Sequence, residues 1–218
     1  MSVSTYGGLK SAVVDWAYTG GGLTTTIVAN DIFPQVQSMM YMGDGTDIET
    51  NDFCIHNNEL YAAGQWTLGG STKRVAKWNG SAWVALPAQP IGKVDCIASF
   101  NGNLVIGGFG VAAGSVNVLR YDGTAWVPMG NGLNNEVFDL YPFNGSLYAG
   151  GQFSASGATP MSFVARWDGS QWNPVGGSVA APGIAERAWT FTTFNNQLVV
   201  GGGFTTLGGI VVNGVARL

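Results

Sequence analysis

One ten-residue pattern occurs four times in the chain, and it constrains the fold more than any other feature. The copies read NNELYAAGQW at 57–66, NGNLVIGGFG at 101–110, NGSLYAGGQF at 144–153 and NNQLVVGGGF at 195–204. Their shared leucine recurs after 44, 43 and 51 residues. Self-similarity on this scale indicates a chain built from repeated supersecondary units that stack on one another.

A second motif follows each copy at a similar spacing. It reads RVAKWNGSAW at 74–83, VLRYDGTAW at 118–126, FVARWDGSQW at 163–172 and GVARL at 214–218. The Asn-Gly and Asp-Gly pairs in both motifs accept positive φ at both central positions, which favours two-residue type I′ hairpins. Each repeat is therefore predicted to form four antiparallel strands, at about 94–100, 103–108, 116–121 and 125–129 in the second repeat.

The fourth repeat ends before its outermost strand, and a segment near the other end of the chain can supply it. Met42 precedes the leucine of its repeat by 18 residues, as Leu86 precedes Leu104. Four-stranded units that recur every ~40–50 residues are propeller blades. Residues 38–42 are therefore predicted to pair beside 214–218, which closes the ring and removes two exposed sheet edges.

The predicted fold class is mainly β: a four-bladed β-propeller over 38–218, closed by an N-terminal strand and preceded by a short helical segment, 1–37. A five-bladed propeller is the alternative, because GGGLTTTIVAN at 20–30 echoes GGGFTTLGGIVVN at 201–213. The aromatic residues of the second motif are expected to pack between blades rather than to serve as platforms for stacking ligands. They are Trp78, Trp83, Tyr121, Trp126, Trp167 and Trp172.

The N-terminal segment has a different period. In TYGGLKSAVVDWAY at 5–18, apolar residues fall at i, i+3, i+4 and i+7, namely Leu9, Ala12, Val13 and Trp16. This spacing predicts an amphipathic helix, which the glycines at 20–22 would end. A short helix of this kind needs a cover for its apolar stripe. We expect Leu9, Val13 and Trp16 to bind a partner, and the chain's own propeller is the alternative cover.

Composition and charge exclude several classes of function. Charged residues make up 10% of the chain, the net charge is −4 and no basic run exists, so no nucleic-acid partner is expected. No apolar run approaches the ~20 residues of a membrane-spanning helix, so no membrane insertion is expected. The start, MSVSTYGGLK, lacks the basic and apolar regions of a secretory signal, so a signal peptide is not expected either.

Few groups could perform covalent chemistry or hold a cofactor. Cys54 and Cys96 are expected to be two separate thiols, and with His56 as the single histidine a zinc site lacks ligands. The candidate carboxylates for glycosidase chemistry do not cluster in the sequence; they are Asp95, Glu136, Asp139 and Glu186. We therefore expect no catalytic residue, no metal site and no cofactor, and hence a protein that is not an enzyme.

Two resemblances follow from these motifs. The pattern N-G-x-L-Y-x-G-G-x-F followed by V-A-R-W-D-G-S-x-W resembles the kelch-like, galactose-oxidase-type propeller repeats of bacterial surface proteins and some phage proteins, over about four-fifths of the chain. The first 40 or so residues look like the start of bacteriophage head–tail adaptor proteins. The matching positions are Thr5, Tyr6, Leu9, Lys10, Ala12, Val13, Asp15, Trp16, Met40, Tyr41 and Gly43. The adaptor family continues as helices, whereas this chain continues as propeller repeats.

A propeller is a scaffold that hosts many activities and does not specify one. The expected function therefore follows from the resemblance to phage proteins. The expected function is a bacteriophage virion structural protein: a tail- or head-associated knob, fibre or adaptor component that docks onto other virion structural proteins through its N-terminus. The expected location is the virion, after synthesis in the host cytoplasm without a signal peptide. The alternative is a lectin-like module that binds a glycan or another component of the host surface.

Overall fold

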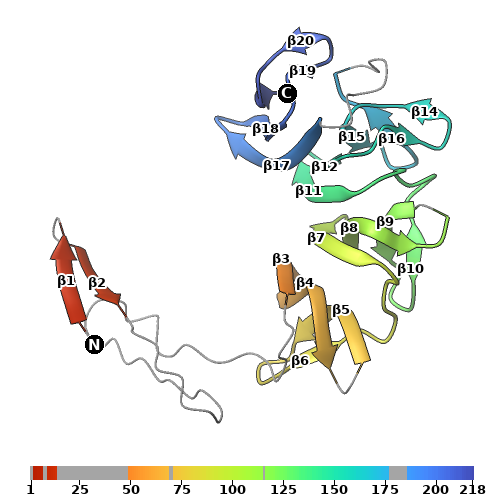
Figure 1. Cartoon of the computed structure of the whole chain (residues 1–218). Helices are drawn as coiled ribbons and strands as arrows, with labels where there is room; N and C mark the ends of the chain where they lie inside the picture. Colours follow the sequence, from red (N-terminus) through yellow and green to blue (C-terminus); the bar gives the residue numbers. More distant parts are fainter. Residues whose placement is uncertain (1, 7–8, 14–48, 69–70, 115, 177–185) are drawn as a thin grey trace. The chain divides into compact units, whose positions relative to one another are not determined.

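The computed structural model describes residues 2–6, 9–13, 49–68, 71–114, 116–176 and 186–218 (Figure 1). Every helix or strand found in these ranges is a β-strand, which confirms the prediction of a mainly β chain. The chain divides into two compact units, Met1–Gly43 and Asp44–Leu218.

In the first unit, β1 (Ser2–Tyr6) and β2 (Leu9–Val13) form an antiparallel hairpin. The helix predicted over 5–18 is therefore wrong where the structure describes that range. Gly7-Gly8 gives a physical reason, because each glycine costs a helix about 1 kcal/mol relative to alanine, whereas paired glycines favour a two-residue hairpin connection. The rest of the predicted helix, including Trp16, and the predicted closing strand 38–42 lie outside the described residues.

The second unit contains four antiparallel sheets that follow the sequence repeats. The first sheet is β3 (Glu49–His56), β4 (Glu59–Leu68), β5 (Ser71–Trp78) and β6 (Trp83–Ala85). The second is β7 (Lys93–Phe100), β8 (Asn103–Ala112), β9 (Val116–Tyr121) and β10 (Trp126–Pro128). The third is β11 (Val137–Phe143), β12 (Ser146–Gly151), β15 (Val164–Trp167) and β16 (Trp172–Pro174). The fourth is β17 (Arg187–Phe194), β18 (Gln197–Gly203) and β21 (Val215–Arg217).

Two small hairpins, each a separate two-stranded sheet, lie in the chain between the second and third strands of the third and fourth sheets. They are β13 (Ala155–Ser156) with β14 (Thr159–Pro160), and β19 (Thr206–Leu207) with β20 (Ile210–Val211). The predicted strands of the second repeat agree with β7 to β10 to within a few residues.

The two predicted kinds of turn differ in the structure. Between the first and second strands, Asn101 and Gly102 both have positive φ (48° and 73°), as a type I′ turn requires. Between the third and fourth strands the prediction was wrong. There Gly123 has positive φ but Asp122 does not, and the Asp122 carboxylate accepts hydrogen bonds from the backbone N–H groups of Thr124 and Ala125. The side chain thus holds a four-residue loop of the Asx type.

Each first strand carries a β-bulge at the same place, and a glycine of the second strand lies opposite it. The register shifts between Thr50 and Asp52 in β3, and at the equivalent positions in β7, β11 and β17. A Cβ added to the opposing glycine would lie only 1.9–2.1 Å from a backbone carbonyl oxygen in all four sheets. The glycine–oxygen pairs are Gly64–Glu49, Gly108–Lys93, Gly151–Glu136 and Gly202–Arg187. The repeated glycine is therefore required by close backbone approach at a bulge.

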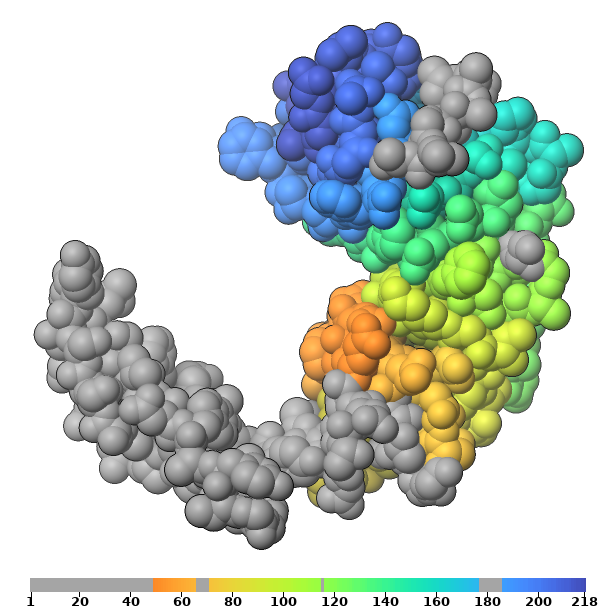
Figure 2. Space-filling model, in the orientation of Figure 1, coloured from red at the N-terminus to blue at the C-terminus, as the bar shows by residue number. Residues whose placement is uncertain are grey.

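Consecutive sheets of the second unit pack against one another, as the succession of colours from orange to blue shows (Figure 2). They bury three apolar clusters between them. Indole N–H groups add hydrogen bonds across these interfaces: Trp126 Nε1 donates to the Ala88 carbonyl at 3.1 Å, and Trp172 Nε1 to the Met129 carbonyl at 3.2 Å. Packing between sheets is thus the role of both tryptophans, as the sequence predicted. Among the described residues, the four sheets do not form a closed ring.

Candidate functional site

The residues predicted to bind a partner have a different setting from the one the sequence indicated. Leu9 and Val13 lie in β2, and Trp16 lies outside the described residues. Because β2 is a strand, the helical stripe that was used to select these three residues does not exist over 9–13.

The described part of the second unit contains a cleft of about 380 Å³ between the second and third sheets. Its apolar lining includes Phe100, Met129 and Trp167. Its polar lining includes Asn101, Asn103, Arg120 and Ser170. These side chains come from strand ends and turns of two different repeats, so no single sequence motif contains the site.

The third-sheet wall of the cleft is held by aromatic packing. The Trp167 ring lies 5.3 Å from the Trp172 ring, centroid to centroid, and Trp172 is itself buried and hydrogen-bonded to Met129. Gly130 has a φ of +58°, and a Cβ there would lie 3.1 Å from both the Trp167 ring and the Ser170 carbonyl oxygen. This close packing limits the freedom of the Trp167 ring.

The second-sheet wall presents a guanidinium group and amide groups. Arg120 Nη1 donates to Asn103 Oδ1 at 3.2 Å, and Asn103 Nδ2 donates to the Asn101 carbonyl at 2.9 Å. At the equivalent positions of the first sheet, Lys77 forms an ion pair with Glu59 at 2.9 Å. The second sheet thus hydrogen-bonds its cation to a neutral amide at the cleft, and the exposed Asp122 carboxylate is the acidic group that interacts with Arg120.

The chemistry of this lining suits binding. An aromatic ring stacks on the apolar face of a sugar, while amide and guanidinium groups donate hydrogen bonds to its hydroxyl or carboxylate groups. The described residues that line the cleft include no carboxylate, histidine or cysteine. The cleft therefore lacks, among those residues, the usual pair of groups for acid–base catalysis.

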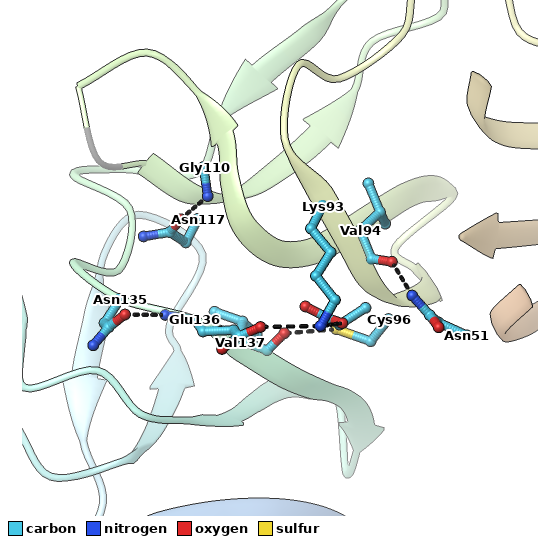
Figure 3. A network of polar contacts seen from close by, with 10 residues as sticks. Asn51, Lys93, Val94, Cys96, Gly110, Asn117, Asn135, Glu136 and Val137 are labelled. Carbon is cyan, nitrogen blue, oxygen red and sulfur yellow. Dashed lines mark hydrogen bonds and ion pairs between the residues drawn. The ribbon is translucent and has the colours of Figure 1, made fainter. Parts of the chain in front are cut away.

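Two of the candidate carboxylates meet outside this cleft, at the junction of β7 and β11. Lys93 Nζ lies 2.6 Å from Asp95 Oδ1 and 3.2 Å from Glu136 Oε1 (Figure 3). Burial raises the pKa of Asp95, against the lowering effect of Lys93. One further hydrogen bond joins the same strands, from the Cys96 thiol to the Val137 carbonyl (Figure 3). The carboxylate pair is thus part of the contact between the second and third sheets.

Another aspartate position joins sheets in a repeated manner that sequence reasoning missed. Asp52 Oδ2 accepts from the Ile97 N–H of the second sheet at 2.8 Å, and Asp139 Oδ2 accepts from the Phe191 N–H of the fourth at 2.7 Å. Burial raises the pKa of both aspartates. The available signal was their shared place, four residues before the end of a first strand. Glu186 also bonds locally, accepting from the Thr205 hydroxyl at 2.8 Å.

The remaining reactive side chains are engaged or buried. His56 Nδ1 lies 2.8 Å from Ser99 Oγ of the next sheet. Cys54 and Cys96 are both free thiols, and burial raises the pKa of Cys54 to about 12, which leaves it protonated and unreactive near neutral pH. No three His, Cys, Asp or Glu side chains of the described ranges gather as they would around a metal ion. No described helix is long and apolar enough to cross a bilayer.

No protein-family model matches the sequence, and no curated protein matches it. Similar solved structures include two computationally designed proteins. The Ika8 protein has a TM-score of 0.43 and 14% identity, over 73% of this chain and 46% of the Ika8 chain. The Ika4 protein has a TM-score of 0.41 and 13% identity, over 80% of this chain and 94% of the Ika4 chain. The chain thus spans less than half the length of Ika8, and similarity at this level carries no information on function.

Proposed function

We propose that the chain is a bacteriophage virion structural protein: a tail- or head-associated knob, fibre or adaptor component that performs no catalysis. The scaffold role is supported by one observation: several carboxylates form contacts between sheets. Asp52 and Asp139 accept backbone hydrogen bonds from a neighbouring sheet, and Asp95 and Glu136 share Lys93. The assignment to a virion is supported by the resemblance of residues 5–43 to head–tail adaptor proteins.

The scaffold that we propose is a four-bladed β-propeller whose ring is completed by residues 38–42 beside β21. It is supported by the strand counts, since the first three sheets have four strands and the fourth has three among the described residues. Deleting residues 1–44 should therefore lower the melting temperature sharply, whereas deleting 1–30 should leave the second unit folded. Equal melting of the two truncated proteins would contradict the closing strand and favour the five-bladed alternative.

Docking onto other virion proteins is proposed for the N-terminal segment, with Leu9, Val13 and Trp16 as contact residues. Trp16→Ala should prevent the protein from co-sedimenting with purified particles without changing the melting of the second unit. Trp189→Ala is the matched control, because Trp189 is an exposed tryptophan of β17. If Trp16→Ala protein enters particles as well as the control does, the docking proposal is wrong.

The cleft between the second and third sheets favours a second candidate function, a lectin-like module that binds a host-surface glycan. Trp167→Ala and Arg120→Ala should each reduce binding on a glycan array by roughly fivefold or more, since truncating an aromatic or arginine anchor costs above 1 kcal/mol. Arg166→Ala is the control, because Arg166 is the exposed counterpart of Arg120 in the third sheet. Equal binding by all three variants would rule out the cleft as the glycan site.

A further inference from the structure

Equivalent positions of the four first strands differ in burial in a way that singles out the first sheet. Three residues before the end of its strand, each later sheet has an apolar side chain that packs against the preceding sheet. Ile97, Leu140 and Phe191 are at most 6% exposed, whereas Phe53, the equivalent residue of β3, is 54% exposed. Phe53 thus has the position of a core residue without the sheet that would bury it.

The opposite face of the fourth sheet shows the complementary difference. The valine of the V-A-R-W motif faces the next sheet, and Val75, Val118 and Val164 have no exposed surface. Val215, the equivalent residue of β21, is 62% exposed. The row of sheets therefore ends in two apolar faces, one on each side, that match the buried faces between its members.

The space around the second-strand glycines also differs between the fourth sheet and the second and third sheets. A Cβ at Gly107 would lie 3.0 Å from the Val137 Cβ of the next sheet, and a Cβ at Gly150 would lie 3.2 Å from the Ala188 Cβ. A Cβ at Gly201, the equivalent residue of β18, would meet no atom closer than 3.6 Å, and that atom belongs to its own sheet. The position that corresponds to Val137 and Ala188 in the first sheet is Thr50.

Charge at the start of the first strands adds a fourth, independent observation. The residues opposite the bulge glycines alternate in sign around the sheets; they are Glu49, Lys93, Glu136 and Arg187. Lys93 and Glu136 form an ion pair across the junction of the second and third sheets. Because the alternation has an even number of members, closing the row brings Arg187 beside Glu49, which are opposite charges.

We propose that the fourth sheet packs against the first sheet of the same chain through a face that repeats the three existing interfaces. Phe53 and Val215 lie in its core, Thr50 lies against Gly201, and Arg187 pairs with Glu49 at its rim. The proposal rests on the ring architecture proposed above and names the surfaces that meet.

The proposed closing strand, residues 38–42, favours the same chain rather than a second copy as the occupant. In the described sheets, the outer strand of one sheet leads directly into the first strand of the next through residues 86–92, 129–136 and 175–186. A strand at 38–42 would enter Glu49 through residues 43–48, a link shorter than any of these three, so the sheet that accepts it is held beside the first sheet. The fourth sheet is the one with three strands in the described part.

An engineered disulfide tests the interface. Thr50→Cys and Gly201→Cys are combined in a Cys54→Ser background. Equivalent Cβ atoms lie 3.0–3.2 Å apart at the existing interfaces, so a separation of the two faces by about 0.6 Å gives the ~3.8 Å that a disulfide prefers. We expect oxidation of the full-length protein to give a linked monomer, detected as a faster band on a non-reducing gel and as an internal cross-linked peptide by mass spectrometry. The Gly150→Cys, Ala188→Cys pair is the positive control, because its interface is present in the structure.

The other outcomes overturn the proposal. A linked dimer would show that a second copy covers these faces, and absence of linkage while the control pair links would show that the faces do not meet. Charge reversal supplies a second measurement on the same pair: Glu49→Lys or Arg187→Glu should each slow linkage at low salt by about threefold, and the two together should restore it. Unchanged rates in the single variants would refute the rim contact. None of these results depends on incorporation into particles, so the interface can fail while the virion proposal stands.

Discussion

Replacing Gly108 by alanine should destabilise the protein more than replacing a turn glycine does. Gly108 lies in β8 opposite the bulge of β7, and an added Cβ would be 2.0 Å from the Lys93 carbonyl oxygen and 2.9 Å from the Val94 Cα. Both neighbours are backbone atoms, so they cannot move aside as the end of a flexible side chain does. The strands would have to separate by about 1 Å to reach a tolerable contact.

The magnitude follows from the forces that this separation opposes. Overpacking in a tight interior costs about 1–3 kcal/mol, and weakening one ladder hydrogen bond costs about 1 kcal/mol more. The loss of backbone freedom in the unfolded chain returns about 0.4–1 kcal/mol. We therefore expect Gly108→Ala to lower the free energy of unfolding by about 2–3 kcal/mol.

Gly123→Ala separates this effect from a simple preference for glycine. Gly123 has a φ of +102° in the loop between β9 and β10, and a Cβ there would meet no atom within 4 Å. Only backbone strain opposes that substitution, which costs about 1–2 kcal/mol. Urea unfolding followed by tryptophan fluorescence measures both variants. If Gly108→Ala costs no more than Gly123→Ala, close approach at the bulge is not the reason for the repeated glycine.

Two further predictions concern hydrogen bonds between the sheets. Asp139 has a raised pKa, so its contribution to stability is greatest below the ordinary aspartate pKa and declines as pH rises through the raised value. Asp139→Asn can still accept the hydrogen bond from the Phe191 N–H. Its stability relative to the parent protein should therefore increase as pH rises above about 4, in urea titrations at several pH values. A stability difference that stays constant with pH would contradict the raised pKa. Trp172→Phe should lower the free energy of unfolding by about 2–4 kcal/mol, through loss of the hydrogen bond to Met129 and a residual cavity. Trp126→Phe, at a half-buried site, should lower it less. Equal losses of stability in thermal melts would count against burial as the cause.

Local turn and repeat signals were sufficient to predict the strand order of each sheet. Asn101-Gly102 fixes a two-residue hairpin by backbone preference alone, and the recurring glycines mark the bulges. Over Leu9–Val13 the predicted helix was wrong because apolar positions at a helical spacing can occur by coincidence, and Gly7-Gly8 in the sequence opposes a helix. The loop at Asp122 was missed because a side-chain hydrogen bond, rather than backbone preference, sets its geometry.

The candidate cleft could not be predicted, since its groups become neighbours only when two sheets pack. Arg120 and Trp167 belong to different repeats. Their equivalents in other repeats, such as Arg166 for Arg120 and Trp78 for Trp167, do not line the cleft. The roles of Asp52 and Asp139 are of the same kind, because each accepts a hydrogen bond from a strand more than 40 residues away. Contacts between repeats, unlike turns within them, depend on packing that no local pattern contains.

The central claim, that the chain is a structural component of a bacteriophage particle, is tested most directly by quantitative mass spectrometry of density-purified virions from the lysate in which the protein is made. The account predicts that peptides of this chain co-purify with the particles at a fixed ratio to the major capsid protein through successive gradients. Recovery of those peptides only in the soluble fraction of the lysate, with none in intact particles, would contradict it.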